Sequence, residues 1–190
     1  MQVDDQLQRI ITKLEAREPI QQLLPQSVWD EELDNEIADI RLPDKNRTAA
    51  LALRAALHLC NDSLDRSHAF AQQIEHDRTG AYWHGIMHRM EGDYWNAKYW
   101  FRQAGSHPAL LEVQKAAGDC LAQTSMPEGE IGKRLREAVS GSLWNAASFV
   151  DAVELQESGK GTEQSALVLE RLQQCEMRAL LRYTLDWVYL

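Results

Sequence analysis

The chain has 190 residues, of which 44% are hydrophobic and 26% are charged, and its formal net charge is -9. A chain of this length can bury a substantial core without disulfides, and its composition excludes a disordered protein. The acidic balance argues against nucleic-acid and anionic-membrane partners, because these are recognised through clustered Lys and Arg.

The three cysteines, Cys60, Cys120 and Cys175, are far apart and lie within apolar helical patterns. An odd number of cysteines without CxxC spacing predicts buried thiols in a reducing compartment. The first residues lack the basic and apolar segments of a signal peptide, and no apolar stretch approaches the ~20 residues that cross a bilayer. We therefore expect a cytoplasmic protein with no membrane partner.

Apolar residues recur with helical period along the chain, and no segment alternates as a half-buried strand does. A first helix is expected from about Asp4 to Glu18 and a second, acidic one from Val28 to Ile40. Asp44 is expected to cap a third helix that is rich in Ala and Leu. Further helical patterns run to Ala117, and the last helices are expected within about residues 130–190. We predict a single all-α domain, residues 1–190, built as an array of about eight to nine helices.

An internal repeat with an offset of 31 residues lies in the central region, about residues 44–108. Asn61-Asp62-Ser63-Leu64 aligns with Gly92-Asp93-Tyr94-Trp95, and Phe70, Gln72 and His76 align with Phe101, Gln103 and His107. Such a period predicts stacked helix pairs, because one pair cannot bury its apolar face alone. Asp62 and Asp93 are then expected to be the N-caps of the second helix in each pair.

Four residues of the second unit, Gly85, Ala97, Phe101 and Ala104, have the spacing of the small and aromatic packing positions in tetratricopeptide repeats. The segment 78–108 therefore resembles one tetratricopeptide repeat, and the preceding unit is more loosely similar. The resemblance implies helix-pair repeats at the centre of the fold and a groove that binds a peptide or protein partner. The string Tyr-Trp-His-Gly-Ile-Met-His-Arg-x-Glu-Gly-Asp also resembles a group of uncharacterised bacterial and fungal proteins, a resemblance that implies no function.

Two stripes of side chains are expected on the helix 81–91. Trp83, Ile86, Met87 and Met90 form the apolar stripe, and His84, His88 and Glu91 form a second stripe at the border of the core. Two imidazoles one turn apart can reach one metal ion, and a carboxylate adds an oxygen ligand. The preceding helix pair brings further candidates into this region, among them Asp65 and His68.

These residues allow two interpretations. In one, His84, His88 and a carboxylate, either Glu91 or Asp65, bind a divalent metal or act as acid and base on a small polar substrate. In the other, the histidines are structural residues at the edge of the core. The zinc-protease motif H-E-x-x-H is absent, because residue 85 is Gly.

The helix 94–104 carries a second candidate surface, formed by Trp95, Lys98, Tyr99 and Arg102. The leading hypothesis is a non-enzymatic helical scaffold that uses these residues to bind a peptide or protein partner and needs no cofactor. The metal-dependent or acid–base enzyme is the alternative. The chain ends on apolar residues, which predicts that the tail packs on the body of the protein or on a second copy, so self-association stays open.

Overall fold

The computed structural model describes residues 5–43 and 45–190, and every regular element in that part of the chain is helical. The all-α prediction is confirmed, with ten α-helices where eight to nine were expected. Asp4 and Asp44, the expected helix start and helix cap, lie outside the described residues. The α-helices are α1 (Asp5–Glu15), α2 (Glu31–Asp39), α3 (Arg47–Cys60), α4 (Leu64–Ala71), α5 (Arg78–Glu91), α6 (Tyr94–Ala104), α7 (Leu110–Ala122), α8 (Gly129–Val139), α9 (Ala146–Leu155) and α10 (Glu163–Val188). A 3₁₀ turn, η1 (Gln72–Ile74), follows α4, and a π-helical turn, η2 (Gln156–Lys160), follows α9.

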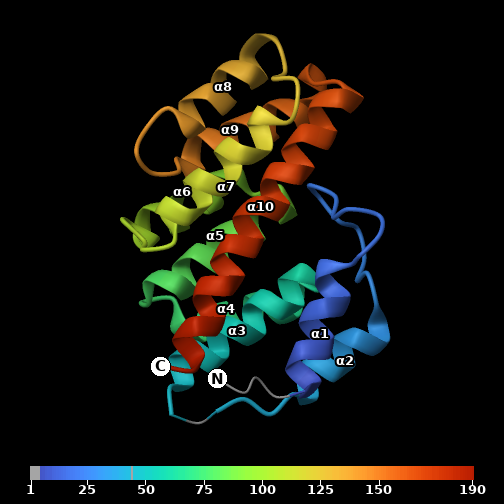
Figure 1. Cartoon of the computed structure of the whole chain (residues 1–190), viewed down its shortest axis with the longest axis vertical. Helices are drawn as coiled ribbons and strands as arrows, with labels where there is room; N and C mark the ends of the chain where they lie inside the picture. Colours follow the sequence, from blue (N-terminus) through green and yellow to red (C-terminus); the bar gives the residue numbers. More distant parts are fainter. Residues whose placement is uncertain (1–4, 44) are drawn as a thin grey trace.

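Helix α10 runs diagonally across the whole molecule and joins its two halves (Figure 1). Its 26 residues begin at a capping box, in which Thr162 accepts from the backbone N–H of Ser165 and the Ser165 hydroxyl accepts from that of Thr162. The first half of the helix packs against α7, and the second half packs against α3. None of the helices in the described ranges has the length and apolar character needed to span a membrane.

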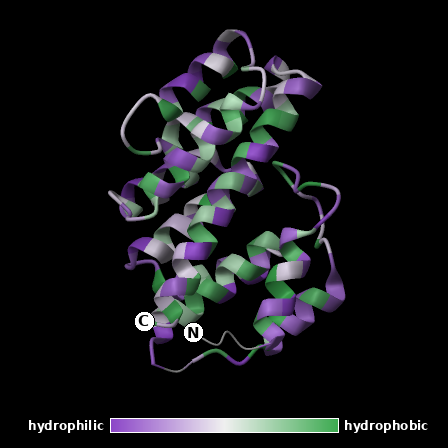
Figure 2. Ribbon diagram, viewed as in Figure 1, coloured by the Kyte–Doolittle hydropathy of each residue, from purple (hydrophilic) through white to green (hydrophobic). Residues whose placement is uncertain are grey.

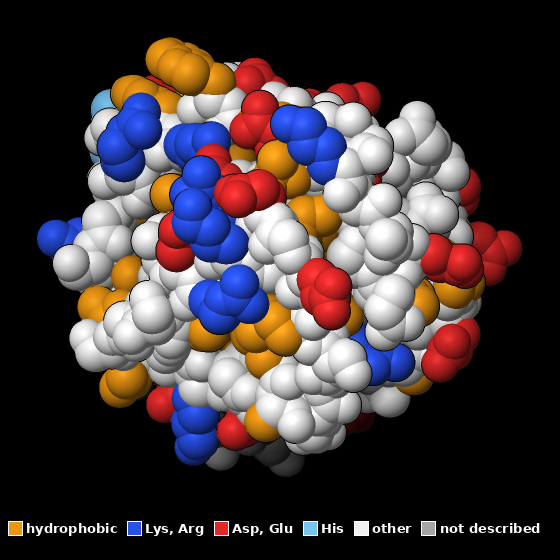
Figure 3. Space-filling model, turned by 90° about the horizontal axis from the view of Figure 1, so that it is seen from above, with side chains coloured by type: hydrophobic (Ala, Val, Ile, Leu, Met, Phe, Trp, Pro, Cys, Tyr) orange, Lys and Arg blue, Asp and Glu red, His pale blue; other side chains and the backbone are white. Residues whose placement is uncertain are grey.

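The buried apolar residues form two clusters, one in each half of the molecule. The first is built from α1, α2, α3, α5 and the second half of α10, and the other from α7, α8, α9 and the first half of α10. Figure 2 shows the corresponding apolar faces turned inward along these helices, with polar residues outside. Lys and Arg side chains lie beside Asp and Glu side chains on the end of the molecule seen in Figure 3.

Helix α5 is enclosed on all sides. Every residue from Thr79 to Met90 is buried, including the histidines that were expected only to border the core. The helix packs against α3, α4 and α6, and three of its side chains are joined to α10, two by hydrogen bonds and one by an ion pair. A helix in this position must bring its polar side chains into the interior, where each one needs a partner.

The strongest of these partnerships is an ion pair between α5 and α10. Nη2 of Arg89 lies 2.7 Å from Oε2 of Glu176, and both side chains are fully buried. The other carboxylate oxygen of Glu176 accepts from the Tyr82 hydroxyl at 3.1 Å and from Nε1 of Trp144 at 2.8 Å. The Arg89 guanidinium also lies 4.6 Å from the ring centre of Phe149. Glu176 thereby ties α5, α10 and the start of α9 together.

The two aligned strings of the repeat fall at equivalent turns, between α3 and α4 and between α5 and α6. Asp93 caps α6 as expected, since its side chain accepts from the backbone N–H of Asn96. The expectation for Asp62 was wrong, because α4 begins after Ser63, and the Asp62 carboxylate instead pairs with Arg17 and Gln21. The relation to tetratricopeptide repeats stays a prediction.

The chain end packs on the body of the same molecule. Val188 is buried, and Trp187 and Tyr189 contact the first cluster, whereas Leu190 is 97% exposed.

Two glycines in helices give a matched test of this packing. A Cβ on Gly80 would lie 2.4 Å from the carbonyl oxygen of Ile74, whereas a Cβ on Gly118 would meet no atom within 4 Å. We expect Gly118→Ala to stabilise the protein by about 0.5–1 kcal/mol through helix propensity. Gly80→Ala should instead destabilise it, because the backbone of η1 must move. Urea unfolding of both variants measures the difference, and equal effects would contradict this packing of α5.

Candidate metal site

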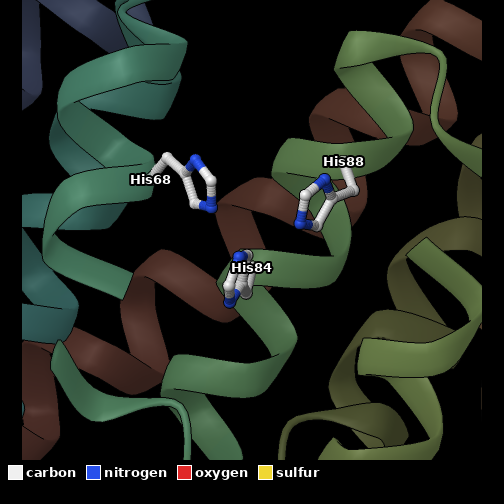
Figure 4. A group of neighbouring side chains, drawn as sticks. All are labelled: His68, His84 and His88. Carbon is white, nitrogen blue, oxygen red and sulfur yellow. The ribbon is translucent and has the colours of Figure 1, made fainter. Parts of the chain in front are cut away.

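Three histidines from two helices meet beside α6. His68 comes from α4, and His84 and His88 come from α5, one turn apart. One ring nitrogen from each of the three lies within 4.8 Å of the other two. Figure 4 shows the three imidazoles close together, with His68 on one helix and His84 and His88 on the next. This group, His68, His84 and His88, is called the histidine cluster below.

Local structure explains why the two helices present these side chains to each other. The segment between α4 and α5 is short, so the two helices become neighbours. Asp77 ends that segment and caps α5, accepting from the backbone N–H groups of Thr79 at 2.7 Å and Gly80 at 3.1 Å. At the other end of α5, Gly92 has φ 82°, and Asp93 donates its backbone N–H to the carbonyl of His88. Both ends of the helix are therefore fixed around the cluster.

His84 is a buried polar side chain to which the described residues offer no hydrogen bond. It is 2% exposed, and neither of its ring nitrogens has a hydrogen-bond partner. Its ring stacks on Trp100 of α6, with ring centres 4.1 Å apart, and on His88, with ring centres 4.7 Å apart. Stacking satisfies the faces of the imidazole but not its nitrogens, and an unpaired buried nitrogen costs about 1–3 kcal/mol. Buried polar groups without a hydrogen bond are uncommon in folded proteins.

His88 does have a partner, which orients it. Its Nδ1 lies 3.0 Å from Oε2 of Glu91, one turn further along α5. Because an ionised carboxylate only accepts hydrogen bonds, Nδ1 of His88 carries the proton and Nε2 keeps its lone pair. A carboxylate that holds the distal N–H of a histidine is the usual support of a metal-ligating imidazole.

Burial favours the neutral form of the His84 and His88 rings. It lowers the pKa of His84 to about 3, and the nearby His88 and His68 add to the effect. Burial also lowers the pKa of His88, even though Glu91 acts in the opposite direction. Neutral imidazole is the form that binds metal ions.

The spacing of the cluster suits one metal ion after a small movement. Zinc–nitrogen bonds of 2.0–2.1 Å place tetrahedral nitrogen ligands about 3.3 Å apart. The ligand atoms here lie within 4.8 Å of one another, so side-chain rotation has to bring them together by about 1.5 Å. His68 is the least buried of the three and the one on the neighbouring helix, so it is the ring best able to move.

Neither of the two carboxylates that were expected as metal ligands, Glu91 and Asp65, belongs to the histidine cluster. Glu91 contacts His88, whereas Asp65 is exposed near the start of α4 and is not part of the group that could hold an ion. His68 completes the cluster but was only one of several candidates on the preceding helix pair. It lies three residues after Asp65, so both side chains are expected on the same face of the helix. The sequence alone could not show which of the two contacts α5.

The other buried histidines show what a structural histidine looks like in this fold. His107 accepts from the backbone N–H of Ala109 at Nδ1 and bonds to the Thr79 hydroxyl at Nε2. His58 has Nδ1 2.7 Å from Asp34. Among the described histidines, only His84 has both nitrogens buried and unpartnered.

The second predicted surface lies on the outer face of α6. Trp95 is 74% exposed and Tyr99 is 38% exposed. Lys98 is paired with Asp151 of α9 at 2.5 Å, so its charge is already compensated. Arg102 and Lys98 line a pocket of about 280 Å³ between α6 and the start of α9, with Tyr82 and Trp144 in its wall. The four residues therefore share one face of α6, but Lys98 is engaged within the chain.

No protein-family model matches the chain, and no curated protein or solved structure matches it.

The bonding of His107 gives a pH prediction outside the cluster. Burial lowers the pKa of His107 to about 4, below the ordinary value of 6.5, so the folded state favours the neutral ring. The stability that this ring contributes is complete above pH 6.5 and falls as the pH drops towards 4. Between pH 7.5 and pH 5, the wild type should lose about 1–2 kcal/mol more of its unfolding free energy than His107→Gln does. Urea titrations at both values test this, and an equal loss in the two proteins would refute it.

Proposed function

We propose that the protein binds one divalent transition-metal ion through His68, His84 and His88. The observation that carries the proposal is His84, whose two ring nitrogens are buried without a partner beside two further imidazoles. Burial of a polar ring without a partner is costly, and a metal ion supplies the missing bond.

The ligand set favours a particular class of metal. Three imidazoles suit zinc, copper and nickel, whereas calcium and magnesium require oxygen ligands. Glu91 is the group that holds the N–H of His88, so its charge supports the site without occupying a coordination position.

Three protein ligands leave one position open on a tetrahedral ion. Catalytic zinc sites keep such a position for water or substrate, whereas structural zinc sites use four protein ligands. The reaction class that follows is metal-assisted acid–base chemistry on a small polar molecule, with the metal lowering the pKa of a bound water.

Metal titration tests the proposal. Calorimetry of the metal-free protein with Zn²⁺ or Cu²⁺ should give one equivalent bound per chain. His84→Ala should weaken binding by more than about 100-fold, because loss of a ligand exceeds the 10–100-fold cost of losing a ligand's support. His76→Ala is the matched control, since His76 is exposed and outside the cluster. A wild type that binds no metal, or a His84→Ala variant that binds as the wild type does, would overturn the proposal.

The role of Glu91 gives a separate prediction. Glu91→Gln retains a hydrogen-bond acceptor for His88 but removes the charge, so metal affinity should fall about 10-fold. Glu112→Gln removes the same charge from an exposed position on α7 and should leave the affinity unchanged. Equal affinities for the two variants would show that the contact between Glu91 and His88 does not support metal binding.

The exposed face of α6 favours a second candidate function, the binding of an acidic peptide or protein partner. Trp95 offers an exposed ring, and Arg102 lies at the nearby pocket. Titration with an acidic, aromatic-containing peptide should shift the emission of Trp95 to shorter wavelength as the ring is covered, and should not do so in Trp95→Phe. An unchanged wild-type emission would remove this candidate. It ranks second because Lys98 is already paired with Asp151.

A further inference from the structure

A continuous series of aromatic rings leads from the histidine cluster to the surface. His84 stacks on Trp100, with ring centres 4.1 Å apart. Trp100 meets Tyr99 edge to face at 5.1 Å, and Tyr99 stacks on Trp95 at 6.3 Å. Trp95 is 74% exposed, so the series ends in solvent.

Core packing explains only the inner member of this series. Trp100 is partly buried against the first cluster and covers the imidazole of His84. Trp95 and Tyr99 belong to neither apolar cluster, although both are large rings that folding usually buries. They lie one turn apart on the outer face of α6 with their rings nearly parallel, at 12°. The positions of Trp95 and Tyr99 are therefore not explained by the stability of the fold. Their rings continue the series of contacts that begins at the buried ring of His84.

The side chains in the series share one chemical property. Indole and phenol are the protein groups most readily oxidised by one electron besides the sulfur-containing side chains. An electron moves between rings at such distances far faster than through an equal length of saturated chain. The three rings on α6 thus provide three short steps in place of one long one.

We propose that Trp100, Tyr99 and Trp95 form an electron-transfer path between a redox-active metal at the histidine cluster and the protein surface. This inference rests on the proposed metal site and adds that the metal is one that changes its oxidation state, as copper does. Copper fits a ligand set of three imidazoles, and it binds more tightly than the other divalent ions of the first transition row.

The step can be written with a hydroperoxide as oxidant. One hydrogen peroxide takes one electron from Cu(I), giving Cu(II), and one electron and one proton from the indole of Trp95. With one further proton from solvent, both peroxide oxygens leave as two water molecules. Tyr99 and Trp100 are oxidised and reduced again in passing, so neither changes in the net reaction. A one-electron reductant in solution, such as a thiol or ascorbate, then restores Trp95 at the surface.

The test uses the whole protein with copper as the metal. Copper binding is measured first, after which the Cu(I) form is treated, without oxygen, with one equivalent of hydrogen peroxide. Rapid freezing and electron paramagnetic resonance then report aromatic radicals. Peptide mass spectrometry of a second sample, exposed to oxygen after the peroxide step, reports oxidation of Trp95. In the wild type, Trp95 oxidation should exceed that of the metal-free protein by several-fold.

The decisive variant is Tyr99→Phe, which keeps the ring and its stacking but removes the oxidisable phenol. It should bind copper as the wild type does, while Trp95 oxidation falls to the metal-free level. Tyr94→Phe makes the same change on the same helix outside the series and should behave as the wild type. Equal Trp95 oxidation in Tyr99→Phe and the wild type would overturn the path, since diffusing radicals then account for the product.

The outcomes separate the two proposals. If the wild type binds copper but its Trp95 oxidation equals that of the metal-free protein, the electron-transfer path is wrong and the proposed metal site is retained. A wild type that binds no copper and no zinc overturns both.

Discussion

The enclosure of α5 is the constraint on which the rest of the structure depends. Arg89 brings a charge into a fully buried position, and the carboxylate of Glu176 on α10 neutralises it there. Removal of one partner from such a pair costs about 3–5 kcal/mol, because the other charge is left buried and unpaired. Glu176 also accepts from Tyr82 and Trp144, so the long helix α10, the start of α9 and α5 are held in one arrangement. The position of α5 next to α4 and α6 follows from this arrangement.

Because α5 is enclosed, its buried polar side chains depend on partners within the protein. Arg89 has Glu176, Thr79 has His107, and Trp83 donates to Thr184 at 3.0 Å. His88 has Glu91, which lies at the edge of the core. Among the described residues, no group of the protein bonds to either ring nitrogen of His84. The proposed metal site rests on this buried ring and on its two imidazole neighbours, His68 and His88.

The positions of helices and of local caps such as Asp93 could be predicted from the sequence, but the complete burial of α5 could not. The bounds expected for α6 and for the end of α5 agree with the structure because Gly92 and Asp93 are local signals. The stripe of His84, His88 and Glu91 was also visible, since it depends only on spacing along one helix. His68 and the partners of Arg89 and Lys98 could not be assigned, because they come from other helices, up to α10 at the far end of the chain. Asp62 was misread as a cap for the same reason, since Arg17 and Gln21 reach it from the N-terminal segment.

X-ray absorption spectroscopy of the protein loaded with one equivalent of zinc tests the central claim most directly, because it identifies the ligands. The proposed site predicts a first shell of nitrogen and oxygen at about 2.0–2.1 Å, with outer scattering from three imidazole rings. His84→Ala should lower the number of imidazoles or abolish binding. A spectrum without imidazole scattering, or one dominated by sulfur at about 2.3 Å, would contradict the assignment of the metal to the histidine cluster.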